Sequence, residues 1–126
     1  MINAIIVDDE PYCTEALAIL LQRYCPQVDL KGSYHSAGEA LAAIRAQHPQ
    51  LLFLDIEMPR MNGFELLEKI KDLSFELIFT TSYDQYAIKA IRFSALDYLL
   101  KPIDREELVR SVQKWRSAFS LRCRSR

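Results

Sequence analysis

The chain has 126 residues, of which 50% are hydrophobic and 26% are charged, and its formal net charge is −1. These values are typical of one globular domain with its own core, and they exclude a strongly positive field that would attract nucleic acid. No apolar run reaches the roughly 18 residues that span a bilayer, and the first residues lack the pattern of a signal peptide.

Five short apolar runs predict buried β-strands, because each is bounded by polar or turn residues. In chain order they lie at residues 4–7, at 28–34 as a weaker run, and then at 51–54, 77–79 and 96–100. Between them, apolar residues recur at a spacing of three and four, which predicts that amphipathic helices connect the strands.

The first two helical patterns have recognisable ends. Pro11 suits the first turn of a helix whose apolar face continues to Tyr24. Ser36 begins a capping-box sequence with Glu39 three residues later, and Pro49 ends the helix that follows.

Three further helices are predicted after the turn at Asn62, after Asp84 and after Asp104, with Asp84 and Asp104 as side-chain caps. Five strands that alternate with five helices predict an α/β domain with a parallel sheet covered on both faces. Residues 121–126 lose the apolar periodicity and gather arginines, which indicates a basic tail or the start of a linker.

Polar residues follow the predicted strands at the point where each one ends. In an open parallel sheet, ligands bind beyond the carboxyl ends of the strands, so these residues are expected to converge. They are Asp8 and Asp9 after the first run, Asp55 after the third, Thr81 after the fourth and Lys101 after the fifth. Each one alone has an ordinary explanation as a cap, a strand end or a solvated lysine, and only their joint placement indicates a site.

The chemistry of this set favours a hard divalent cation and a phosphoryl group. Adjacent carboxylates repel one another unless a cation lies among them, and Mg²⁺ prefers a few carboxylates together with water. Asp55 stands alone at its strand end and is therefore the predicted nucleophile, while Asp8 and Asp9 share the metal. A lysine ammonium and a threonine hydroxyl suit the remaining phosphoryl oxygens.

These residues resemble the receiver domain of bacterial two-component response regulators. The matching stretches are IIVDDEP, LLFLDIEMPRMNGFELL, FTTSYD and YLLKPI, which are spread along almost the whole chain. The resemblance implies a flavodoxin-like, doubly wound, five-stranded parallel sheet with strand order 2-1-3-4-5 and five helices. The receiver would occupy residues 1–120, followed by the tail.

The resemblance also implies a role for each site residue. Asp55 matches the phosphoacceptor, and Asp8 and Asp9 match the acidic pair that binds Mg²⁺. The third protein ligand of the metal, a main-chain carbonyl, falls on Glu57. A glutamate at this position departs from the commonest pattern, and its side chain is expected either to alter hydrolysis of the phosphoaspartate or to point to solvent.

Four more residues have family counterparts near the carboxyl end of the chain. Lys101 matches the lysine that pairs with the phosphoryl group, and Thr81 matches the switch hydroxyl. Tyr98 matches the aromatic side chain that rotates on the output face, and Pro102 matches a proline that follows a cis peptide bond. The implied partners are a sensor histidine kinase and a second copy of the chain, bound through the fourth helix, fifth strand and fifth helix.

The segment TTSYDQYAIKAIRFSALDYLLKPID resembles the LytTR (LytR/AlgR) class of receivers more specifically. Regulators of this class carry a LytTR DNA-binding domain after the receiver, and these 126 residues contain no such domain. DNA contact is therefore expected only through that absent domain. Tyr83, Tyr86 and Phe93 are expected to be packing or rim aromatics near the output face.

The cysteines are consistent with a cytoplasmic protein, and no membrane partner is expected. Cys13, Cys25 and Cys123 form no C-x-x-C pair and leave one residue over, a pattern that favours reduced thiols over a disulfide framework or a zinc site.

Two other functions deserve comparison with a signalling receiver. A phosphohydrolase with an aspartyl-phosphate intermediate usually has a second aspartate two residues after its nucleophile, where this chain has Glu57, and no long loop is available to form a substrate pocket. A phosphate-independent interaction module of the same fold usually lacks some of the site residues, all of which are present here. We therefore predict a phosphoacceptor signalling domain rather than an enzyme.

Overall fold

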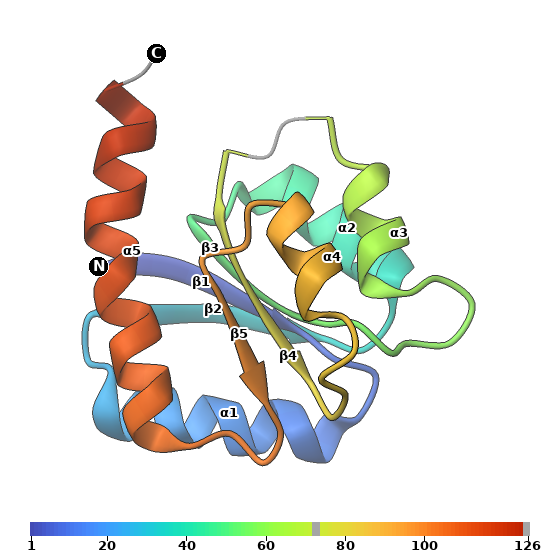
Figure 1. Cartoon of the computed structure of the whole chain (residues 1–126), viewed down its shortest axis with the longest axis horizontal. Coiled ribbons are helices and arrows are strands. Elements are labelled where there is room, and N and C mark those ends of the chain that lie inside the picture. Colours follow the sequence, from blue (N-terminus) through green and yellow to red (C-terminus); the bar gives the residue numbers. More distant parts are fainter. Residues whose placement is uncertain (72–73, 125–126) are drawn as a thin grey trace.

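The computed structural model describes residues 1–71 and 74–124, with side chains described as far as residue 118. Strands and helices alternate without exception (Figure 1). In chain order they are β1 (Ile2–Val7), α1 (Pro11–Tyr24), β2 (Val28–Tyr34), α2 (Ala37–Gln47), β3 (Leu51–Asp55), α3 (Gly63–Glu68), β4 (Glu76–Thr81), α4 (Ala87–Arg92), β5 (Asp97–Leu100) and α5 (Arg105–Arg124).

The five strands form one parallel sheet in the order β2-β1-β3-β4-β5. This confirms the predicted flavodoxin-like fold and its strand order. The central strands are buried along their length, and every residue of β3 and β4 is buried. Their continuous apolar runs follow from this position, because a strand covered on both faces has no solvated side.

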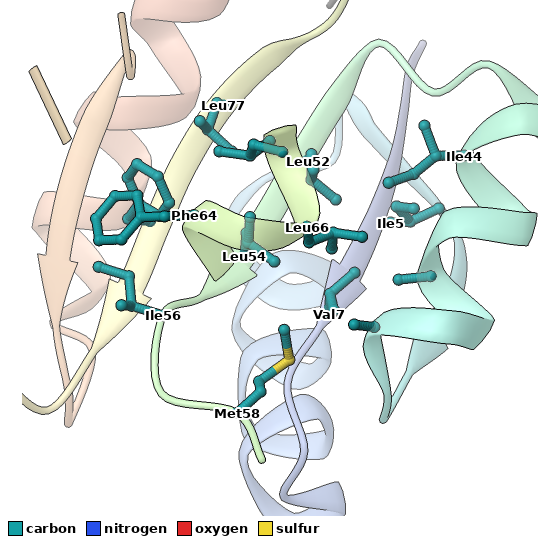
Figure 2. Close-up of a cluster of buried hydrophobic side chains, with 14 of the residues drawn as sticks. Ile5, Val7, Ile44, Leu52, Leu54, Ile56, Met58, Phe64, Leu66 and Leu77 are labelled. Atoms are coloured by element: carbon teal, nitrogen blue, oxygen red, sulfur yellow. The ribbon is translucent and has the colours of Figure 1, made fainter. Parts of the chain in front are cut away.

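Helices cover both faces of the sheet and divide its core in two. Helices α1 and α5 pack on one face, and α2, α3 and α4 lie on the other (Figure 1). Successive strand residues point to opposite faces, so Ile5 and Val7 pack towards α2 and α3, while Ala4 and Ile6 belong to the core beneath α1 and α5. Figure 2 shows the cluster between the sheet and helices α2, α3 and α4, with Phe64 of α3 packed among the aliphatic side chains.

Local sequence explains where most helices begin. Ser36 accepts a hydrogen bond from the Glu39 N–H at 3.2 Å, and Asp104 accepts one from the Glu107 N–H at 3.0 Å. Pro11 occupies the first turn of α1. These three helix starts agree with the predictions. Ser36 and Asp104 each satisfy a backbone N–H that the helix itself leaves unpaired, and Pro11 has no such N–H to satisfy.

The predicted cap of the fourth helix was wrong. Asp84 offers its main-chain carbonyl to the N–H of Ala87 at 3.3 Å, and the helix begins after Tyr86, whose side chain forms no cap. The N-cap position is occupied by Tyr86, so Asp84 lies two residues too early to cap the helix with its side chain.

Two sequence predictions fall wholly or partly outside the described residues. Helix α5 continues through Arg124, so its backbone includes most of the segment predicted as a basic tail, while residues 125–126 and the side chain of Cys123 are not described. Cys13 and Cys25 are free thiols, as expected. Among the described residues, no helix has both the length and the apolar character needed to cross a membrane.

Candidate functional site

Three carboxylates meet at the carboxyl ends of the parallel strands. Asp8 directly follows β1, and Asp55 is the last residue of the neighbouring strand β3. Val7 lies opposite Leu54 in the parallel register, which brings the two aspartates to the same level. One carboxylate oxygen from each of Asp8, Asp9 and Asp55 lies within 4.8 Å of the other two.

Lys101, which follows β5, places its ammonium group among these carboxylates. Its Nζ lies 2.6 Å from an oxygen of Asp8 and 3.5 Å from an oxygen of Asp55. The backbone N–H of Lys101 donates to the carbonyl of Thr81 at 2.8 Å, and the Lys101–Pro102 peptide bond is cis. The structure therefore brings the predicted lysine into direct contact with one predicted metal ligand and close to the predicted acceptor.

Gly63 allows helix α3 to begin directly against the acceptor strand. Its N–H donates to the carbonyl of Ile56 at 2.9 Å, and a Cβ at this position would lie only 2.7 Å from the main-chain oxygen of Asp55. Any larger residue would displace the backbone that carries the acceptor. The first turn is held by a capping box in which Asn62 and Glu65 each bond the other's backbone N–H.

The site has more negative charge than its one lysine balances. Burial, together with the neighbouring charges of Asp8 and Asp9, raises the pKa of Asp55 to about 7, against the opposing effect of Lys101. Burial alone would lower the pKa of Lys101, but its hydrogen bond with Asp8 and the charge of Asp55 outweigh burial and raise it. A divalent cation would relieve this excess charge, since it favours ionised carboxylates.

The residues present fit Mg²⁺. The three side chains offer carboxylate oxygens, and this is the one such group of potential metal ligands among the described residues. An all-oxygen set with few carboxylates suits Mg²⁺, which retains several waters, better than it suits zinc or copper. Asp8, Asp9 and Asp55 would supply the side-chain ligands.

The predicted switch residues lie on the neighbouring strands. Thr81 ends β4, is fully buried, and accepts a hydrogen bond from the N–H of Tyr83 at 3.3 Å. Tyr98 on β5 is half-buried, and its hydroxyl donates to the carbonyl of Tyr83 at 2.5 Å. Tyr83 thus connects through its own backbone to both side chains.

The side chain of Glu57 has a partner that sequence reasoning missed. The backbone of Glu57 acts to lower the pKa of the Asp55 carboxyl, while the carboxylate of Glu57 accepts a hydrogen bond from the Tyr86 hydroxyl. The side chain is exposed, in keeping with the expectation that it points to solvent, but its contact with Tyr86 was not predicted. The two residues are 29 positions apart, and no motif spacing signals such a contact.

A cleft of about 530 Å³ opens beside the carboxylates, between α1 and the segment after β5. Asp8 and Lys101 line its inner end, and Tyr12, Leu20 and Ile103 line its apolar part. The carboxylate site is therefore reachable from the α1 side of the molecule.

Comparisons with known proteins agree with this geometry. A family model described as "Response regulator receiver domain" matches residues 4–113. The chain is 41% identical over 114 residues to the sensory transduction protein LytT of Enterococcus faecalis, covering 89% of this chain and 47% of that protein. It is also 41% identical over 121 residues to the transcriptional regulatory protein BtsR of Salmonella typhimurium, covering 95% and 50%.

A solved structure shows the same architecture. The response regulatory domain of protein mrkE from Klebsiella pneumoniae superimposes with a TM-score of 0.82 at 27% identity, covering 94% of this chain and 98% of that one. The chain spans about half the length of the curated relatives that it matches.

Proposed function

Because the chain belongs to the response regulator receiver domain family, we propose that it is a phosphoacceptor domain in which Asp55 takes a phosphoryl group from the phosphohistidine of a sensor kinase. The observation that carries the proposal is the convergence of Asp8, Asp9, Asp55 and Lys101 at the carboxyl edge of the sheet. Positioning and charge neutralisation are the main requirements of phosphoryl transfer, and this cluster supplies groups for both.

The residues have distinct tasks in the transfer. A carboxylate oxygen of Asp55 attacks phosphorus, forming a P–O bond as the P–N bond to the kinase histidine breaks and the imidazole leaves. Mg²⁺, when bound by Asp8, Asp9, Asp55 and the main-chain carbonyl of Glu57, supplies positive charge to the phosphoryl oxygens. Lys101 lies 3.5 Å from Asp55 and can pair with a phosphoryl oxygen there.

The same residues support a conformational switch. Thr81 is the last residue of β4, and its hydroxyl accepts a hydrogen bond from the N–H of Tyr83. Its movement to a phosphoryl oxygen would release Tyr83, whose carbonyl holds the hydroxyl of Tyr98. Tyr98 could then turn inward, so that one added dianion changes the surface of α4, β5 and α5.

The surface of α4, β5 and α5 suits a contact with a second copy of the chain. Ile88 and Ile91 of α4 are 73% and 74% exposed, and Leu100 at the end of β5 is 45% exposed. Exposed apolar side chains on neighbouring elements favour association, so we propose that phosphorylation promotes a homodimer through this face.

The output is proposed to be transcriptional. The relatives named above include a transcriptional regulatory protein, and the chain covers 50% of its length. We propose that a LytTR-type DNA-binding domain follows in the full-length cytoplasmic protein, and that DNA is contacted only through it. The helical backbone of residues 121–124 would begin the connection.

Phosphorylation by a small donor tests the acceptor directly. The protein is incubated with acetyl phosphate, with and without Mg²⁺, beside an Asp55→Asn variant, and its intact mass is measured. We expect one added phosphate that requires both Mg²⁺ and Asp55. If neither acetyl phosphate nor a phosphohistidine donor protein adds phosphate, the chain is instead a phosphate-independent interaction module.

A further inference from the structure

We propose that Tyr86 is a positioning residue for phosphoryl transfer: its hydroxyl holds the Glu57 carboxylate at the start of α4 and so keeps an additional negative charge away from Asp55. This inference rests on the proposed function of Asp55 as the acceptor. It concerns a side chain that the sequence predicted only as a packing or rim aromatic.

Glu57 is linked in two directions. It lies two residues after Asp55, and its backbone acts to lower the pKa of the Asp55 carboxyl. Its carboxylate accepts the hydrogen bond from the hydroxyl of Tyr86, the residue immediately before α4. The hydrogen bond to Glu57 raises the pKa of the Tyr86 hydroxyl. Glu57 therefore bridges the acceptor strand and the start of α4.

Packing fixes the ring of Tyr86 independently of this hydrogen bond. The ring meets Phe64 edge-on with centroids 6.0 Å apart, and it meets Tyr83 in the same way at 6.3 Å. Phe64 is buried and also packs against Phe79 and Phe93. A tyrosine has few rotatable bonds, so a fixed ring places its hydroxyl accurately.

The charge balance of the site explains why this placement matters. Three carboxylates already face one ammonium at the acceptor. The carboxylate of Glu57 is absent from that cluster, and Glu57 influences Asp55 through its backbone. The side chain of Glu57 is exposed, so without Tyr86 it would be free to turn towards a site only two residues away. There it would repel an anionic phosphoryl donor.

A set of four proteins separates this role from simple packing. Wild type, Tyr86→Phe, Glu57→Gln and the double variant are phosphorylated by acetyl phosphate with Mg²⁺, and initial rates are read from intact mass. Tyr86→Phe keeps the ring and loses only the hydroxyl. We expect it to slow phosphorylation by about three- to tenfold, since one unscreened charge near the site has an effect of this order.

The charge-specific signature is rescue by a neutral side chain. In the Glu57→Gln background, the Tyr86→Phe change should no longer slow the reaction, and in the wild-type background the deficit should shrink as salt is raised. A deficit that persists in the Glu57→Gln background, or that ignores salt, would show that Tyr86 acts through packing and would overturn the proposal. Equal rates for wild type and Tyr86→Phe would overturn it as well.

Tyr34→Phe provides the matched control. Tyr34 is also half-buried and hydrogen-bonded, accepting from Gln47 Nε2 at 2.7 Å, but its hydroxyl contacts none of the site residues in the described structure. Its loss should leave the phosphorylation rate unchanged. A deficit equal to that of Tyr86→Phe would show that the loss of any tyrosine hydroxyl has this effect.

A measurement without phosphate or metal tests the contact itself. Urea midpoints of the four proteins should be non-additive, because Tyr86 and Glu57 form one interaction. If the effects of the two substitutions on the midpoint were additive and the wild type were phosphorylated normally, the role of Tyr86 would be overturned and the function proposed for Asp55 would stand. Non-additive midpoints with no phosphorylation of the wild type by any donor would overturn the function proposed for Asp55, and with it the role built on it.

Discussion

Helix α4 is anchored very differently from the two helices on the opposite face of the sheet. On one face, α1 and α5 have 14 and 20 residues, and α5 buries Leu108 and Val112 to 0% and 1% exposure. On the other face, α4 has six residues, of which Ala90 is buried. The apolar side chains Ile88 and Ile91 of α4 are largely exposed.

This difference shows how one small domain can be both stable and switchable. Long helices with buried apolar side chains contribute most of the free energy of unfolding, while short elements with few buried contacts open at lower cost. The α1–α5 face therefore supports the sheet edge on which the carboxylates are placed. The α4 region is connected to the same edge through Tyr83 and Tyr86, and within the helix itself Ala90 is the one buried residue.

The largest expected effect is on the supporting face. Leu108→Ala should lower the free energy of unfolding by about 2–5 kcal/mol, because it leaves a cavity beneath α5. Urea denaturation followed by circular dichroism measures this loss. If Leu108→Ala lowered the free energy of unfolding by no more than the truncation of an exposed leucine does, α5 would not stabilise the domain as its burial indicates.

An intermediate effect on stability is expected at the carboxyl ends of the strands, where Asp55 lies. The raised pKa of Asp55, about 7 against 3.8 for an ordinary aspartate, means that the folded, metal-free protein favours the protonated carboxyl. Its stability should therefore fall as the pH rises from 3.8 towards 7, and Asp55→Asn should remove that dependence. Since Asp9 and Lys101 are partly exposed, screening limits the gain for the variant above neutral pH to on the order of 1–2 kcal/mol.

Urea titrations between pH 4 and pH 8 in a chelator, carried out for wild type and Asp55→Asn, measure this effect. Asp29→Asn is the control, because Asp29 is a partly exposed aspartate away from the site and is paired with Lys31 at 2.7 Å. Saturating Mg²⁺ should reverse the order by stabilising the wild type more than Asp55→Asn. A wild type that gains stability with rising pH in the chelator would contradict the charge excess at the site.

The smallest effect on stability is expected on α4. Ile91→Ala should change the free energy of unfolding by less than about 0.5 kcal/mol, because the side chain is mostly exposed already. The same change should weaken the proposed dimer of the phosphorylated protein, which sedimentation velocity can detect. A large loss of stability, or an unchanged phosphorylated dimer, would each contradict the view of α4 as a loosely packed contact surface.

Much of the architecture was predictable because its signals are local. The apolar runs at residues 4–7 and 51–54 mark central strands, and the caps at Ser36 and Asp104 mark two helix starts. Parallel strands bring their carboxyl ends to one edge, so the convergence of Asp8 with Asp55 followed from the order of the elements. The predicted Asp84 cap was wrong because the capping propensity of a residue does not show at which residue the helix begins, and α4 begins at Ala87.

By itself, the sequence determined the fold, the strand order implied by its family resemblance, and the set of polar residues at the strand ends. Only the tertiary structure decided how those groups pair: Lys101 lies closer to Asp8 than to Asp55, and Glu57 reaches Tyr86 across 29 residues. It also decided the raised pKa of Asp55, which depends on burial and on neighbouring charges. The physical reason is that periodicity and capping act over a few residues, whereas pairing, burial and charge depend on distances that exist only after the helices have packed on the sheet.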